Sequence, residues 1–165
     1  MECRCNRRRV AALGDGAWNT AEGMSEEHVE IVRRFLDAYV AADYERAASL
    51  LHAEAQWHNT PSFPGPQTVD GPEAIRHFWR DMFEAFAGPS RSGSGMEAER
   101  ITDHDDVVVA EVHGWGAGKS SAARFDRRWA HAFRHKDGKI VRIDTYGSYE
   151  RALEVLGLEH HHPAS

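Results

Sequence analysis

The chain has 165 residues, of which 41% are hydrophobic and 28% charged, and its formal net charge is -6 at pH 7. This length favours one globular domain with a single core, and the negative charge argues against nucleic acid or an anionic membrane as the main partner. No stretch approaches the roughly 20 consecutive apolar residues that a transmembrane helix needs. The two cysteines, Cys3 and Cys5, lie too close together for an easy disulfide and give no sign of an oxidising compartment. We therefore expect a cytoplasmic protein.

The two ends of the chain differ in composition from the part between them. Residues 1–23 are rich in arginine, lack the apolar core of a secretory signal and contain glycines that disfavour a helix. We predict a disordered basic extension there, with Met24 as an alternative start. Residues 159–165 are predicted to form a flexible tail whose adjacent histidines make no specific metal site. The folded domain is expected over residues 24–158.

Hydrophobic spacing and turn residues predict the order of the secondary structure. Apolar residues recur at helical spacing after Ser25, a plausible helix cap, and Pro72 stands at the first turn of a further helix. Runs rich in β-branched and aromatic residues follow in the second half of the chain, as in antiparallel strands. The predicted helices cover residues 25–42, 44–51, 72–86 and 150–156. The predicted strands before the last hairpin cover residues 55–59, 96–102 and 107–115, with a Pro-rich loop at 60–70.

The strongest local signal is a hairpin close to the C-terminus. Asp137 and Gly138 stand between two runs of alternating apolar residues and are typical of a two-residue turn. Alternation places His131 in an otherwise aromatic row on one face of the first run. The residues expected to share the inner face of the two runs are Trp129, His131, Phe133, Val141, Ile143 and Thr145.

These elements predict an α+β fold with helices gathered on one face of a curved sheet. A sheet bent around one long helix leaves a conical cavity with an apolar floor. Such cavities bind small molecules by shape, while a few polar groups fix the orientation of the ligand. We find no nucleophilic triad, phosphate-binding glycine loop or metal-ligand spacing, so we expect neither a cofactor nor a metal.

Three segments, residues 43–58, 70–75 and 137–140, resemble the nuclear transport factor 2-like (NTF2-like) superfamily. Within it, the chain is most similar to the SnoaL-like polyketide cyclases and the ketosteroid isomerases, over about residues 25–157. The resemblance implies an NTF2-like cone, in which a curved antiparallel β-sheet wraps around the N-terminal helices and encloses an apolar pocket. It also implies a ligand that is a small apolar molecule, and we expect a homodimer through the outer face of the sheet.

The functional residues that the ketosteroid isomerase comparison implies are not present at the matching positions of this chain. The position of its general base is Asn59, whose amide cannot remove a proton at neutral pH. Its two oxyanion-hole donors fall at Phe35, which has no hydroxyl, and near Ala130 or His131. Steroid isomerisation is therefore not expected.

The polyketide cyclase comparison implies that His131 is the pocket histidine. It also implies an acid/base aspartate on the following strand, where this chain has Thr145 with Asp144 beside it. Neighbouring strand residues face opposite sides of a sheet, so Asp144 should face outward with Arg142 unless a β-bulge near Thr145 reverses it.

The resulting hypothesis is a cofactor-free cyclase, isomerase or lyase. His131 would remove an acidic α-proton, burial among aromatic rings would keep it neutral, and Asn59 or His58 would hydrogen-bond the enolate oxygen. Only one of His58 and Asn59 can face the cavity. The alternative is a non-catalytic ligand-binding or dimerisation module with the same pocket. The residues predicted to bind the ligand are Phe35, Tyr39, Trp57, Trp129, Phe133 and Tyr146.

Overall fold

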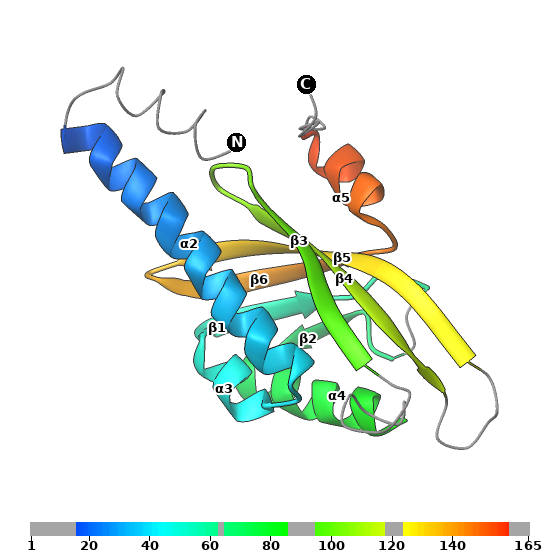
Figure 1. Cartoon of the computed structure of the whole chain (residues 1–165). Helices are drawn as coiled ribbons and strands as arrows, with labels where there is room; N and C mark the ends of the chain where they lie inside the picture. Colours follow the sequence, from blue (N-terminus) through cyan, green and yellow to red (C-terminus); the bar gives the residue numbers. More distant parts are fainter. Residues whose placement is uncertain (1–15, 63–64, 86–94, 118–123, 159–165) are drawn as a thin grey trace.

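The computed structural model of the protein describes residues 16–62, 65–85, 95–117 and 124–158 (Figure 1). Its helices are α2 (Gly16–Val40), α3 (Tyr44–Ser49), α4 (Pro72–Ala85) and α5 (Tyr149–Leu156). Its strands are β1 (Leu51–His58), β2 (Thr68–Asp70), β3 (Gly95–Asp103), β4 (Val108–Ala117), β5 (Arg124–Lys136) and β6 (Lys139–Tyr146). The predicted extension at residues 1–15 and the predicted tail at 159–165 lie outside the described residues.

The strands form one curved sheet in the order β2-β1-β6-β5-β4-β3. Neighbouring strands run antiparallel except β1 and β6, which pair in parallel through Trp57↔Ile143 and His58↔Asp144. The predicted α+β cone is confirmed, but its sheet is mixed and not purely antiparallel. The prediction of an uninterrupted loop at 60–70 is also wrong, because β2 forms there and pairs with the end of β1.

Helix α2 lies across the strands of the sheet (Figure 1). It begins at Gly16 and not at Ser25, so the prediction that glycines keep residues 16–23 out of a helix is wrong. Its buried face repeats at helical spacing and includes Val32, Phe35, Leu36 and Tyr39. None of the described helices combines the length and apolar composition that crossing a lipid bilayer demands.

Local signals fix the ends of the shorter helices. The side chain of Asp43 accepts a hydrogen bond from the Arg46 backbone N–H at 3.2 Å and thereby caps α3. Ser148 caps α5 in the same way, and Gly157 ends it in the left-handed conformation with φ 67°.

The two faces of the sheet carry separate apolar clusters. The larger cluster joins α2, α3 and α4 to the concave face through Val108, Ala110 and Val112 of β4. The smaller joins α5 to the convex face through Val109 of the same strand. Helix α5 therefore covers the other face, and the prediction that all helices gather on one face is wrong for it. The homodimer through the outer face stays a prediction.

The predicted hairpin between β5 and β6 is confirmed. Asp137 has φ 52° and Gly138 has φ 74°, which are the positive angles of a type I′ turn. Beyond the turn, His135 pairs with Ile140 but Arg134 pairs with Arg142, so β6 holds one extra residue at this point. This bulge shifts the register of every pair beyond it.

Candidate functional site

The only histidine among the described buried residues, His131, lies on β5 and is 1% exposed. The indole N–H of Trp129 donates to its Nε2 at 2.9 Å, which makes Nε2 the unprotonated nitrogen of the ring. Its Nδ1 therefore carries the proton and donates to the hydroxyl of Thr145 at 3.1 Å. Burial lowers the pKa of His131 to about 3. The imidazole is thus neutral, and both of its nitrogens are hydrogen-bonded.

Aromatic rings from three elements surround this imidazole. The ring centroid of His131 lies 5.1 Å from that of Trp57, 5.9 Å from that of Tyr39 and 6.1 Å from that of Phe133. Phe35 closes the group from α2, 5.4 Å from Phe133. Burial, and secondarily the nearby Tyr44, raises the pKa of Tyr39 far above its usual range, so that its phenol also stays neutral. The sequence-predicted ligand residues of the concave side do come together, as a packed aromatic cluster.

Trp129 lies at the border of this cluster and is 8% exposed. It packs over Gly114 of β4, where a Cβ would stand 2.6 Å from the indole ring. Only glycine gives the ring this room. Gly114 therefore sets the position from which the Trp129 N–H reaches His131.

Asn59 follows β1 and is bonded on both sides of its amide. Its Oδ1 accepts the indole N–H of Trp57 at 2.8 Å, and its Nδ2 donates to the carbonyl of Pro66 at 2.9 Å. The structure thus links Asn59 to the aromatic cluster through Trp57. The amide holds the end of β1 against the loop that follows it.

The other predicted site residues lie on the convex side. Asp144 pairs with Ala132, a member of the convex cluster, and its carboxylate accepts the guanidinium of Arg142 at 2.9 to 3.1 Å. His58 pairs with Asp144 across the parallel strands and bonds to Gln56 at 3.1 Å. The structure therefore does not bring His58 or Asp144 to His131.

Tyr146 also belongs to the convex side, where it packs against the cluster of α5. Burial, followed by the neighbouring Asp144, raises the pKa of its phenol. Tyr146 therefore lies on the opposite side of the sheet from the other five residues predicted to bind the ligand, which are Phe35, Tyr39, Trp57, Trp129 and Phe133.

Strand alternation predicted that Trp129 and Thr145 share the inner face with His131, but not that both side chains hydrogen-bond its ring. Thr145 stands directly opposite His131 in the β5–β6 register, and Trp129 precedes it by two residues on the same face. Strand alternation is a signal for Trp129, because residues two apart share a face. The pairing of Thr145 directly opposite His131 depends on the bulge, so no local signal predicts the hydrogen bond between them.

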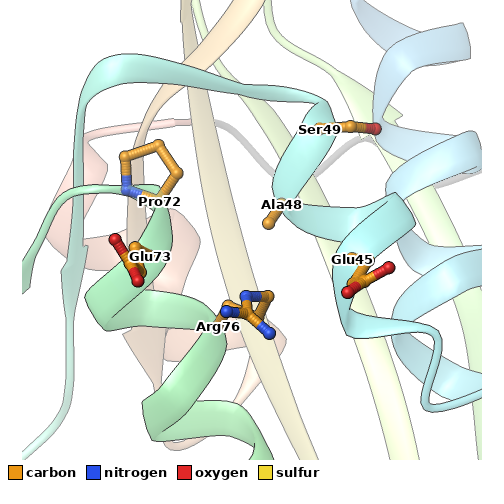
Figure 2. Close-up of a pocket in the computed structure, with 6 residues that line it drawn as sticks. All are labelled: Glu45, Ala48, Ser49, Pro72, Glu73 and Arg76. Carbon is orange, nitrogen blue, oxygen red and sulfur yellow. The ribbon is translucent and has the colours of Figure 1, made fainter.

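A cleft of about 410 Å³ lies between α3 and α4 (Figure 2). Polar and charged side chains contribute much of its lining, and His131 takes no part in it. The cleft is thus different from the predicted apolar pocket, which stays a prediction. Its lining residues are Glu45, Ala48, Ser49, Pro72, Glu73 and Arg76.

The sequence matches the profile of the SnoaL-like domain over residues 32–143. A search among curated proteins gives no match. Among solved structures, the fold is similar to a putative SnoaL-like polyketide cyclase from Jannaschia sp. CCS1, with a TM-score of 0.64 and 18% identity over 82% of this chain and 95% of that one. An NTF2-like protein from Burkholderia thailandensis E264 gives a TM-score of 0.64 and 20% identity over 78% of this chain and 95% of that one. TerC, crystallised with polyporic acid, gives 0.62 and 15% over 79% of this chain and 98% of that one.

Proposed function

This chain belongs to the SnoaL-like domain family, and on that premise we propose that it binds a small, neutral, apolar molecule on the concave side of its sheet. The observation that carries the proposal is the lack of charge there. Of the described buried residues, the polar ones on this side are His131 and Thr145, and they bond to each other and to Trp129. An interior of this kind selects a ligand by shape and apolar contact.

Trp129 is the proposed ligand contact. It lies at the border of the buried cluster, and Met96 stands opposite Gly114 in the β3–β4 register, on the same face as the indole. Met96 is partly buried against the concave cluster. A flat indole and a flexible thioether together favour a planar ring system.

The polar group of the ligand follows from the Trp129–His131 hydrogen bond. The indole N–H is a donor and Nε2 of His131 is an acceptor, and each satisfies the other at 2.9 Å. A ligand that turns the indole aside would meet one neutral donor and one neutral acceptor. We therefore propose a ligand that carries a carbonyl or hydroxyl group. The similarity to TerC, crystallised with polyporic acid, supports an organic ligand of this kind.

A fluorescence titration tests this proposal, with 2-hydroxyanthraquinone as the planar probe. The wild-type protein should show saturable quenching. Replacing Trp129 with Ala should weaken binding by about tenfold or more, since aromatic contacts dominate such sites. Trp129→Phe, which keeps a ring and loses the N–H, should give a smaller loss. Arg134→Ala, which changes the neighbouring convex side, is the matched control. Unsaturable quenching, or an equal loss in the control, would contradict the proposal.

The second candidate is a cofactor-free cyclase, isomerase or lyase. The observation that favours it is a neutral imidazole buried in the concave side. In this mechanism His131 Nε2 removes an α-proton once the ligand has displaced the Trp129 N–H. An imidazole with a pKa of about 3 is a weak base, so the bound ligand would also have to raise that pKa. Asn59, joined to the cluster through Trp57, is the proposed hydrogen-bond donor to the enolate oxygen.

Exchange of the acidic α-proton of dibenzoylmethane in D₂O separates the two candidates. Catalysis by His131 predicts exchange above the buffer rate that falls about 10²–10⁴-fold in His131→Gln. Anthraquinone binding without any such exchange supports the binding module alone. Catalysed exchange that persists in His131→Gln contradicts the enzymatic role of this residue.

A further inference from the structure

A histidine and several carboxylates meet on the convex side, at the end of the sheet that α5 leaves uncovered. Glu97 of β3 stands opposite His113 of β4 in the antiparallel register. A register irregularity between Ala98 and Arg100 makes Glu99 the extra residue of β3. Bulges re-aim side chains, and this one leaves Glu99 beside Glu97 on the side of His113.

The distances between these side chains match those of a metal site. The Nδ1 atom of His113 lies 3.4 Å from Oε1 of Glu97 and 3.6 Å from Oε1 of Glu99. One ligand atom from each of the three residues lies within 4.8 Å of the other two. In a tetrahedral zinc site with bonds of about 2.1 Å, neighbouring ligand atoms stand about 3.4 Å apart. The two distances from Nδ1 therefore already match ligand spacing, and the two carboxylate oxygens lie within 4.8 Å of each other.

The far side of the imidazole is held by a fourth residue. Nε2 of His113 lies 2.8 Å from Oδ1 of Asp126 on β5. An ionised carboxylate only accepts hydrogen bonds, so Nε2 carries a proton. A metal ion would therefore bind at Nδ1, where it would replace the proton that this nitrogen shares with Glu97 and Glu99. A carboxylate that orients a ligating histidine in this way is a recurrent part of zinc sites, and it distinguishes this cluster from a patch of acidic residues.

The charge of the cluster also favours a cation. Its three carboxylates face the guanidinium of Arg128, which donates to Glu99 at 2.7 and 2.9 Å. The charge of Arg100 also acts on Glu99, but Arg100 is itself paired with Glu111 at 3.0 Å. The two hydrogen bonds from Arg128 hold the carboxylate of Glu99 in place. The carboxylates still outnumber the guanidinium groups, so the cluster keeps an excess of negative charge. The side chains of His113 and Glu97 are 15% and 57% exposed, so an ion can reach them from solvent.

We propose that Glu97, Glu99 and His113 bind a divalent transition-metal ion, Zn²⁺ in the first instance, with Asp126 as the residue that positions the imidazole and water as the fourth ligand. An imidazole with two carboxylates suits zinc better than magnesium or calcium, which prefer oxygen ligands alone. The site lies on the opposite face from His131 and is independent of the function proposed above.

Calorimetric titration with ZnCl₂ tests the site. Every protein in the experiment is the full chain with the three adjacent tail histidines replaced by alanine, because they can bind zinc themselves. One equivalent of Zn²⁺ should bind, and Glu97→Gln should weaken binding by about tenfold. His113→Ala should remove it, and Asp126→Asn should weaken it by about 10–100-fold as a loss of orientation. Arg128→Gln should tighten it, since Glu99 is then free. The replaced tail residues are His160, His161 and His162.

The control for His113 is His77→Ala, which removes an exposed histidine beside a glutamate on α4. It should leave binding unchanged. Glu97 is exposed, so its neutral variant keeps the test valid even if His113→Ala is unstable. Saturable binding that survives both His113→Ala and Glu97→Gln, or no saturable binding in the parent, would overturn the proposal. A shift of the His113 ring nitrogens in the NMR spectrum on adding Zn²⁺, with His77 unchanged, would support it.

Discussion

His131 and His113 lie on neighbouring strands of the same sheet but on opposite faces, and their pKa values shift in opposite directions. His131 faces the concave side, where its neighbours are aromatic rings and a threonine, and burial lowers its pKa to about 3. His113 faces the convex side among carboxylates, and its hydrogen bond with Asp126 raises its pKa. The period of two along a strand is enough to keep a neutral and an ionic environment apart.

The two faces of the sheet suit different kinds of ligand. The concave side offers flat apolar surfaces and one donor–acceptor pair, so the ligand proposed for it is neutral. The convex side offers fixed carboxylates and an oriented imidazole, so the ligand proposed for it is a cation. A variant that acts on one side should therefore leave the other ligand unaffected.

The largest difference between the sides should appear on removing a side chain from each. Phe133 is fully buried, with its ring 5.4 Å from Phe35, and Phe133→Ala should lower the free energy of unfolding by about 3–5 kcal/mol. Arg134 is the next residue of β5, with a side chain 41% exposed and 4.0 Å from Asp106. Arg134→Ala should change stability by less than about 0.5 kcal/mol. Urea denaturation measures both, and similar losses would contradict the assignment of the two faces.

A smaller effect is expected where Trp129 packs over Gly114. In Gly114→Ala the new Cβ would stand 2.6 Å from the indole, so the ring must move away from His131. We expect a loss of about 1–3 kcal/mol, as for overpacked cores, together with a change in tryptophan fluorescence. Gly147→Ala is the matched control, because a Cβ there meets nothing within 4 Å. A stable Gly114→Ala with unchanged fluorescence would show that Trp129 does not depend on this contact.

Much of the fold could be predicted because its signals are local. Asp43 before α3, Asp137-Gly138 in the hairpin and Gly157 after α5 each act on the backbone next to them. The parallel pairing of β1 with β6 has no such signal, since it joins residues distant in the sequence. The start of α2 was missed because Gly16 and Gly23 were given more weight than the helix around them.

Alternation alone correctly predicted Thr145 inward and Asp144 outward, whereas the register that sets Thr145 opposite His131 depends on the bulge in β6. Counting back from the Asp137-Gly138 turn without a bulge would put Asp144 opposite His131, on the same face. The extra residue in β6 moves each pair by one, so Thr145 takes that place and Asp144 turns to the convex side. One residue of register thus decides whether the buried imidazole meets a carboxylate or a hydroxyl.

His131 and His113 should also make the free energy of unfolding depend on pH in opposite directions. An unfolded histidine has a pKa of about 6.5, whereas folded His131 stays neutral down to about 3. Above pH 6.5 both states are neutral and His131 contributes no pH dependence. Below it, only the unfolded state takes up the proton, so stability should fall with pH by about 1.4 kcal/mol per pH unit. For His113 the raised pKa favours the folded state below about pH 6.5, and that contribution is lost as the pH rises through its folded value.

His131→Gln isolates the first effect, because a glutamine amide does not titrate yet can accept from Trp129 and donate to Thr145. Other histidines titrate too, and burial lowers the pKa of His135 to about 4, so the informative quantity is the difference in slope between wild type and variant. That difference should be about 1.4 kcal/mol per pH unit between pH 6 and 4. NMR titration of the imidazole protons supplies the residue-specific check, with a midpoint above 6.5 for His113 and none above pH 4 for His131. Equal slopes, or a His131 midpoint near 6.5, would mean that water reaches this imidazole, and the neutral ligand proposed for the concave side would lose its physical basis.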